Sequence, residues 1–231
     1  VLSPTISSES DLDSVDVGES VILSASETPN KSGQIPISGF SWDTDSDGLN
    51  DVNGVTTEQS WPEPGNYSVR LSVTSTDSRS ASTTRTIAVS DISPPTVSMS
   101  PSGQITKGFG EELSVSATFT DNWGVESIDW LFDGSIVLSN YTITEPISTL
   151  SIQVSDDYSA GEHVASIIVT DKSGISTRQD VTVIFIDVSA PVISPYDGRI
   201  EVEGGDPTIL QIFAQDNQSE GLDYTWIFEQ G

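Results

Sequence analysis

Residues 40–51 read Phe-Ser-Trp-Asp-Thr-Asp-Ser-Asp-Gly-Leu-Asn-Asp, and this stretch indicates how the chain folds. Phe40 and Trp42 alternate with a polar residue, so their side chains are expected on one core-facing side of a β-strand. Aspartates then occupy every second position, and Gly48 supplies the positive φ that a sharp turn requires. The stretch therefore predicts a strand that ends in a tight acidic turn.

The acidic turn has the spacing of calcium ligands. Carboxylates placed this close together repel one another, and a bound cation relieves that cost. The residue types match the first positions of a calcium-binding loop, with Gly48 at the sixth position. The predicted ligands are Asp43, Asp45, Asp47, Leu49 through its carbonyl, and Asp51.

One position of that loop departs from the calcium-binding pattern. The twelfth position, which usually holds a bidentate acid, is Gly54, and Glu58 is an acid that could reach the turn from the next segment. We therefore expect weak binding, with a dissociation constant of about 10⁻⁴ to 10⁻³ M. The alternative is a solvated turn whose aspartates accept hydrogen bonds from backbone amides.

Two motifs resemble those of the polycystic-kidney-disease (PKD) type repeat. The first is the Trp-Asp turn at 42–48, which ends in Asp-Gly, and the second is Pro-Gly-Asn-Tyr-Ser-Val-Arg-Leu-Ser-Val-Thr at 64–74. The turn is longer and more acidic than is usual in that family. The resemblance covers residues 1–91 and implies a β-sandwich module of an extracellular protein, without implying an activity. The later chain resembles the Ig-like repeats of bacterial and archaeal surface proteins.

An internal repeat divides the chain into domains. Pro95-Thr-Val-Ser recurs 96 residues later as Pro191-Val-Ile-Ser, and Trp130 recurs at the same interval as Trp226. Short alternating runs separated by Pro, Gly, Ser and Thr predict an all-β chain of tandem Ig-like or PKD-like β-sandwiches. The predicted domains are 1–91, 92–187 and 188–231, and the last is expected to be incomplete because no later strands follow Trp226.

Alternation of apolar and polar residues locates the expected strands. Residues 67–74 are the clearest case, with Tyr, Val, Leu and Val at alternate positions. Relative to the first repeat, the second carries an insertion within residues 135–159. The expected strands are 21–25, 39–42, 67–74 and 82–89 in the first repeat, 127–132, 164–170 and 175–186 in the second, and 208–214 and 222–228 in the third.

The five tryptophans fall into two groups. Trp42, Trp130 and Trp226 lie in equivalent strands, and we expect them between the two sheets, where Ig-like sandwiches place one tryptophan. Trp61 and Trp123 lie in polar, turn-rich segments. We expect these two to pack over the ends of the sandwiches, with stacking on a carbohydrate as the alternative.

The remaining polar residues do not form a catalytic pattern. His163 occupies the place of Tyr67 in the first repeat, which predicts a packed strand residue hydrogen-bonded at the edge of the core. No Gly-x-Ser-x-Gly motif accompanies it, and the absence of cysteine excludes thiol catalysis. Asp91 lies at a domain junction and Asp121 precedes a strand, where hydrogen bonding within loops is favoured over metal binding. We therefore predict that the chain is not an enzyme.

The charge balance restricts the partners. Eight basic and 35 acidic residues give a net charge of −27, which disfavours nucleic acid and anionic membranes, and no apolar run is long enough to insert into a bilayer. We expect a non-catalytic extracellular or cell-surface spacer or adhesion module of a larger prokaryotic protein, with calcium (Ca²⁺) as a stiffening cofactor. Expected partners are other modules of the same protein and a cell-surface protein or polysaccharide. The alternative is an accessory polymer- or carbohydrate-binding segment of a secreted hydrolase.

Overall fold

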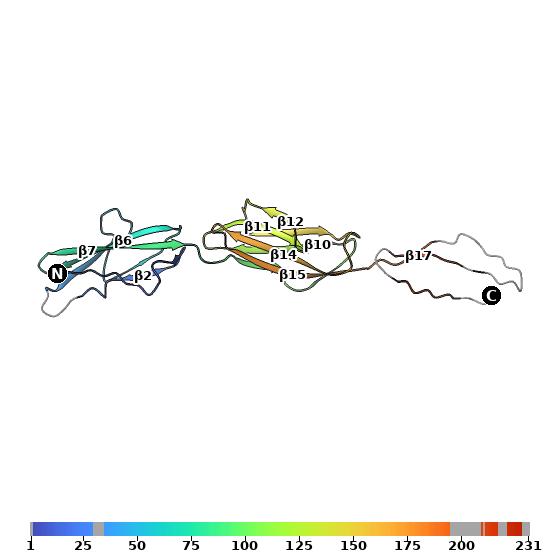
Figure 1. The fold of residues 1–231 in the computed structure, drawn as a ribbon, viewed down its shortest axis with the longest axis horizontal. Helices are drawn as coiled ribbons and strands as arrows, with labels where there is room; N and C mark the ends of the chain where they lie inside the picture. Colours follow the sequence, from blue (N-terminus) through green and yellow to red (C-terminus); the bar gives the residue numbers. More distant parts are fainter. Residues whose placement is uncertain (1, 30–34, 195–208, 210, 217–220, 228–231) are drawn as a thin grey trace.

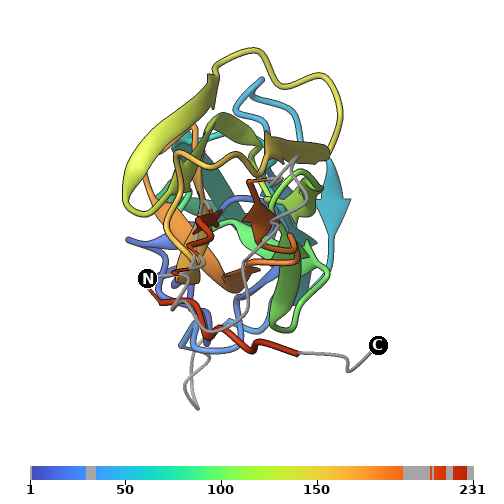
Figure 2. The same ribbon diagram turned by 90° about the vertical axis from the view of Figure 1, so that its right-hand side faces the viewer.

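The chain forms two β-sandwiches that lie end to end, followed by a third, short segment (Figure 1). The computed structural model describes residues 2–29, 35–194, 209, 211–216 and 221–227. All regular structure in these residues is β-strand, so the all-β prediction is confirmed. Viewed along the long axis, the two sandwiches overlap (Figure 2). The described residues contain no helix that could cross a membrane.

The first sandwich has a five-stranded sheet that faces a two-stranded one. Its strands are Val15–Asp16 (β1), Val21–Ser24 (β2), Ile37–Asp43 (β3), Val52–Asn53 (β4), Thr56–Gln59 (β5), Gly65–Ser75 (β6) and Ser80–Ser90 (β7). The larger sheet has the order β1-β7-β6-β3-β4, and the smaller pairs β2 with β5. β1 runs parallel to β7, and the other neighbouring strands are antiparallel.

Alternating side chains of β6 supply much of the core of the first sandwich. Val69, Leu71 and Val73 are fully buried, as the period-two pattern predicts. Trp42 of β3 is also fully buried and donates a hydrogen bond from Nε1 to the Gly54 carbonyl at 2.9 Å. A buried indole N–H needs such an acceptor. The prediction that Trp42 fills the space between the sheets is therefore confirmed.

The second sandwich repeats the order of the larger sheet, and several of its strands are longer than their counterparts. Its strands are Thr96–Ser100 (β8), Ile105–Gly108 (β9), Glu112–Thr120 (β10), Val125–Phe132 (β11), Ser135–Asn140 (β12), Ile147–Gln153 (β13), Gly161–Asp171 (β14) and Ser176–Ile186 (β15). The order β12-β11-β14-β15-β9 matches β4-β3-β6-β7-β1, including a parallel pair at one edge. The facing sheet has the order β13-β10-β8.

Trp130 of β11 occupies the same place in the second sandwich as Trp42 in the first. It is fully buried, and its Nε1 donates to the Ser148 hydroxyl at 3.0 Å. The expected insertion at 135–159 contains β12 and β13, and β12 has six residues where β4 has two. β12 is an edge strand, and its apolar side chains Ile136 and Val137 are exposed.

The third segment differs from the expectation for a repeat. Val192–Ile193 (β16) pairs with Ala214–Gln215 (β17), and residues 221–227 form no strand. Trp226 is 49% exposed, so the prediction that it lies between two sheets is wrong. The physical reason is that the described part of this segment has no facing sheet to cover the indole. The remaining residues of the expected strands 208–214 and 222–228 lie outside the described residues.

Candidate metal centre

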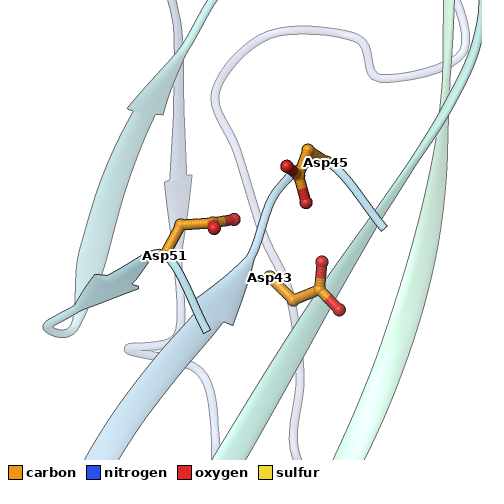
Figure 3. A group of neighbouring side chains, drawn as sticks. All are labelled: Asp43, Asp45 and Asp51. Carbon is orange, nitrogen blue, oxygen red and sulfur yellow. The ribbon is translucent and has the colours of Figure 1, made fainter. Parts of the chain in front are cut away.

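The acidic turn after β3 brings together three of the predicted ligands. Asp43 is the last residue of β3, Asp45 lies in the turn, and Asp51 immediately precedes β4 (Figure 3). One carboxylate oxygen of each lies within 4.8 Å of one from each of the others. Asp43 is buried, and the other two are exposed. These three residues, which we refer to as the turn cluster, could hold an ion.

Both carboxylate oxygens of Asp43 already have partners. The Ser46 amide donates to Oδ1 at 2.8 Å, and the Gly48 amide donates to Oδ2 at 3.2 Å. The Arg70 guanidinium, from β6, lies 3.2 Å from Oδ2 and also donates to the Gly48 carbonyl at 3.0 Å. Arg70 therefore supplies the positive charge that the turn needs, and a metal ion would have to compete with it.

Asp51 is also held by hydrogen bonds. The amide and the hydroxyl of Thr44 donate to its Oδ2 at 2.7 and 2.9 Å. These hydrogen bonds, that of the amide above all, lower the pKa of Asp51 below its usual value because they stabilise the carboxylate. The network supports the alternative of an aspartate-rich turn that binds its own amides. Calcium binding by the turn stays a prediction.

The other predicted ligands lie outside the turn cluster. Asp47 accepts a hydrogen bond from the Leu49 amide at 2.7 Å, and Leu49 itself is 70% exposed. Glu58 lies on β5, in the opposite sheet, where it accepts a hydrogen bond from the Ser20 hydroxyl. The structure thus gives Glu58 a partner away from the turn.

A second group of carboxylates lies where the two sandwiches meet. Asp91 follows β7, Asp121 follows β10, and Asp171 is the last residue of β14. One carboxylate oxygen of each lies within 4.8 Å of one from each of the others, and we refer to the three as the junction cluster. Burial raises the pKa of Asp91, and the charges of Asp121 and Asp171 raise it further. Only the shared position of these residues at strand ends signals the cluster in the sequence, and Asp171 gives no metal signal by itself.

The two sandwiches contact each other directly at this junction. Asn122 of the second sandwich donates from Nδ2 to the Val17 carbonyl of the first at 3.0 Å. The Trp123 side chain packs against the core of the first sandwich. On the connecting segment, Ser93 donates from its hydroxyl to Asp16. The expectation that Trp123 packs over a sandwich end is confirmed, and the sandwich it covers is the neighbouring one.

His163 is a packed core-edge residue, as predicted. It is 7% exposed, and its ring stacks on Phe132 with centroids 5.5 Å apart. Nδ1 lies 2.7 Å from Asp133 Oδ2, and Nε2 lies 2.8 Å from the Ser159 carbonyl. Burial lowers the pKa of His163, but the hydrogen bonds to Asp133 and Ser159 outweigh it, so the pKa lies above its usual value. The imidazole therefore joins two strand ends.

The described tryptophans of the two sandwiches offer no flat exposed platform for a sugar. Trp61 is 5% exposed and stacks on Tyr67 with centroids 5.5 Å apart, which confirms the packing expected for it. Trp123 is covered by the first sandwich, and the Lys172 ammonium lies 5.8 Å from its ring centroid. Exposed aromatic rings of the described residues occur elsewhere, at Tyr141 and in the third segment.

Comparison with known proteins gives a family for the first sandwich and several similar solved structures. Residues 2–90 match the PKD domain family. The fibronectin(III)-like modules of Clostridium thermocellum CbhA are 19% identical over 79% of this chain and 95% of theirs, with a TM-score of 0.36. The PKD1 domain of Vibrio anguillarum Epp is 21% identical over 39% of this chain and 94% of its own, with a TM-score of 0.30.

A further similar structure is a tandem pair. The titin domains z1z2, solved in complex with telethonin, are 14% identical over 80% of this chain and 98% of theirs, with a TM-score of 0.41. No curated protein matches this chain. The assignment of tandem Ig-like sandwiches rests on the strand order of the two domains described above.

Proposed function

We propose that this chain, in which a PKD domain at residues 2–90 precedes another Ig/FnIII-like β-sandwich domain, is a non-catalytic spacer and adhesion module of an extracellular protein. The domains recognised here are of types that serve as accessory modules in extracellular proteins. The proposed site of action is the surface of a prokaryotic cell, or the outside of the cell after secretion. The proposed partners are other modules of the same protein and a surface protein or polysaccharide.

The fixed contact between the two sandwiches carries this proposal. Only residues 91–95 connect β7 to β8, and two of them are the prolines Pro94 and Pro95, which restrict the backbone. Asn122 and Trp123 add a hydrogen bond and an apolar contact across the junction. A connection that is short, stiff and packed holds two sandwiches at a set distance, and a spacer needs that property.

The surface of the chain supports a binding role beside spacing. A net charge of −27 keeps neighbouring modules apart by repulsion. The edge strand β12 exposes Ile136, Val137 and Leu138, at 62%, 48% and 43%. Unpaired edge strands with apolar side chains are surfaces on which another chain can add a strand. We propose β12 as the place where a protein partner makes contact.

Calcium is the proposed stiffening cofactor of the first sandwich. Its predicted site is the acidic turn, and the support is the convergence of Asp43, Asp45 and Asp51. Arg70 and the backbone amides already satisfy Asp43, so binding there should be weak.

The alternative function, a polymer-binding segment of a secreted hydrolase, has one observation in its favour. Tyr224 and Trp226 in the third segment are 53% and 49% exposed, and aromatic rings stack on sugars. Retention on insoluble polysaccharide that is lost in Trp226→Ala would support this alternative. Absence of retention would leave the spacer function.

A distance measurement between the far ends of the two sandwiches tests the spacer proposal. The chain has no cysteine, so Thr76→Cys and Ala160→Cys place two spin labels without further changes. Thr76 lies in the turn between β6 and β7, and Ala160 precedes β14; both are exposed and lie at strand ends opposite the junction. We expect one narrow distance distribution by pulsed electron paramagnetic resonance.

The matched control for this measurement is Trp123→Ala in the same double-cysteine chain. It removes the apolar contact across the junction and leaves the prolines in place, so the distribution should broaden. A broad distribution in the chain that keeps Trp123 would contradict a spacer, because the sandwiches would then move independently.

A further inference from the structure

In each aspartate of the junction cluster, one carboxylate oxygen accepts hydrogen bonds that orient the side chain. Asp121 accepts hydrogen bonds on Oδ1 from the amides of Trp123 and Gly124, at 2.9 and 2.7 Å. Asp171 accepts on Oδ1 from the amide and hydroxyl of Ser173, at 2.8 and 2.7 Å. These bonds fix the orientation of both carboxylates on loops of the second sandwich.

Asp91 reaches the same place from the connecting segment. Its Oδ1 accepts a hydrogen bond from the Ser93 amide at 3.3 Å. The cluster therefore joins the segment that leaves the first sandwich to two loops of the second. Those two loops are themselves linked, because the Lys172 amide donates to the Gly124 carbonyl at 3.1 Å.

The second oxygen of each aspartate has no such partner. Oδ2 of Asp91, Asp121 and Asp171 is buried and receives no hydrogen bond from any described residue. Asp171 is 1% exposed and Asp91 is 6% exposed. A buried carboxylate oxygen without a donor is costly, and three neighbouring carboxylates add mutual repulsion. A ligand of positive charge would remove both costs.

No side chain of the described residues supplies that charge. None of the ion pairs among them includes a member of the junction cluster. Lys172 is the neighbour of Asp171 in the sequence, but its ammonium lies over the Trp123 ring, 5.8 Å from the centroid. A groove lined by residues of both sandwiches, including Asp16 and Glu19, also has Asp121 of the cluster in its lining.

We propose that Asp91, Asp121 and Asp171 bind a calcium-type divalent cation that ties the connecting segment to the second sandwich. The donor set is oxygen only, which suits Ca²⁺ and disfavours metals that prefer histidine or cysteine. Calcium–oxygen distances of about 2.3–2.6 Å allow two ligand oxygens to lie up to about 5 Å apart. The carboxylate oxygens of the cluster lie within 4.8 Å of one another, so they are close enough to share one ion. Water completes the six to eight oxygens that calcium takes.

The competing explanation is a proton shared within the cluster. A carboxylic acid that donates to a neighbouring carboxylate also relieves repulsion and needs no metal. The two explanations differ in their response to calcium. A metal site binds calcium at neutral pH, whereas a proton-sharing cluster does not respond to millimolar calcium.

Calcium titration of the full chain by calorimetry, compared across three variants, tests the proposal. Asp91→Asn and Asp121→Asn keep an Oδ1 acceptor for the loop amides but remove a charge from the cluster. We expect each to weaken calcium binding by at least about tenfold, because affinity follows the number of charged ligands. Asp45→Asn in the turn cluster is the matched control and should leave this binding event unchanged.

Amide spectra of the same samples guard against misfolding and locate the ion. Dispersed nitrogen-15 correlation spectra of both junction variants show that they fold, and calcium should shift the amides around Asp121 and Asp171 in the unsubstituted chain. Equal binding in all variants would overturn the proposal. Absence of any binding up to about 10 mM calcium, well above the range of weak extracellular modules, would overturn it as well.

The proposed calcium binding at the junction does not depend on the spacer function. The proposed stiffening of the junction by calcium does rest on that function. The spin-label pair at 76 and 160 separates the two. A narrow distribution that is unchanged by calcium keeps the spacer and removes the stiffening role. A distribution that is broad with and without calcium defeats the spacer, even where calorimetry shows a bound ion.

Discussion

The turn cluster and the junction cluster contain the same residue type in the same number, yet they differ in what satisfies their charge. In the turn, Arg70 lies 3.2 Å from Asp43, and backbone amides donate to both oxygens of that carboxylate. At the junction, each of the three aspartates keeps a buried Oδ2 without a donor among the described residues. The count of carboxylates is equal, so it cannot distinguish a metal site from a hydrogen-bonded turn.

For cation binding, what matters is whether a buried carboxylate oxygen already has a hydrogen-bond donor or an opposite charge beside it. Removing a carboxylate from water is unfavourable unless hydrogen bonds or an opposite charge replace the lost solvation. In the turn cluster, neighbouring groups of the chain supply both the hydrogen bonds and the opposite charge. The junction cluster obtains hydrogen bonds for only one oxygen of each side chain, which leaves the other oxygens for an ion.

The largest expected effect is a loss of stability confined to the domain that contributes two residues of the junction cluster. Asp121 and Asp171 belong to the second sandwich, so Trp130→Ala should disrupt the junction cluster and spare the turn. Loss of a buried tryptophan typically costs about 3–5 kcal/mol, a large share of the stability of a small domain. Urea unfolding followed by amide spectra should show the second sandwich unfolding at lower urea while β3 and β6 keep their signals. Trp123→Ala should cost much less, and equal costs for the two would contradict the core role of Trp130.

A smaller effect is expected when the turn is made to resemble the junction. Arg70→Ala removes the guanidinium beside Asp43 and should lower the free energy of unfolding by about 1 kcal/mol, because Arg70 is 38% exposed and solvent screens the pair. Millimolar calcium should then restore part of this loss, because binding to the folded state stabilises it. Thermal melts with calcium and with a chelator measure the recovery.

The matched control for that experiment is the double variant Arg70→Ala, Asp43→Asn, which has no buried charge to compensate and should not respond to calcium at the turn. If Arg70→Ala alone gained no calcium response, the availability of free carboxylate oxygens would not be what distinguishes the two clusters.

The smallest expected effect is on the stability that comes from a carboxylate whose positively charged partner loses its charge as the pH rises. Asp133 pairs with His163, and both ring nitrogens of His163 face acceptors, so folding favours the imidazolium. The pKa of His163 is raised in the folded state. Its contribution to stability is therefore complete below the unfolded pKa of about 6.5 and is lost as pH rises through the folded value. Urea unfolding of the second sandwich from about pH 6 to pH 9 should show this decline.

His163→Gln tests whether the decline belongs to that pair. Glutamine does not titrate, so the part of the pH dependence that comes from His163 should disappear from the variant. A decline of the same size in both proteins would assign it to other groups.

Much of the fold follows from local pattern. Alternation along β6 predicted that Val69, Leu71 and Val73 face the core, because a strand sends successive side chains to opposite faces. The place of Trp42 and Trp130 in equivalent expected strands predicted that both lie between the sheets, and both are fully buried. Trp226 shows the limit of the same reasoning, because burial of an indole needs a facing sheet and the described part of the third segment has none.

The candidate site depended far less on local pattern. The spacing of the turn predicted that its aspartates meet; Asp43, Asp45 and Asp51 do, whereas Asp47 lies outside the cluster. It did not indicate Arg70, which reaches Asp43 only because β6 pairs with β3. The junction cluster depends in the same way on strand ends and a connecting segment that come together in the folded chain.

By itself, the sequence determined the main alternating strands of the two sandwiches, their buried tryptophans and the acidic character of the turn, because these depend on side-chain period and on neighbours in the chain. Tertiary structure decided which carboxylates have a cation or a donor beside them. The physical reason is that solvation and charge pairing act between atoms within a few ångströms, whatever their separation in sequence. Asp91, Asp121 and Asp171 are far apart in the chain; the fold of the second sandwich brings the loops of Asp121 and Asp171 together, and the connecting segment places Asp91 beside them.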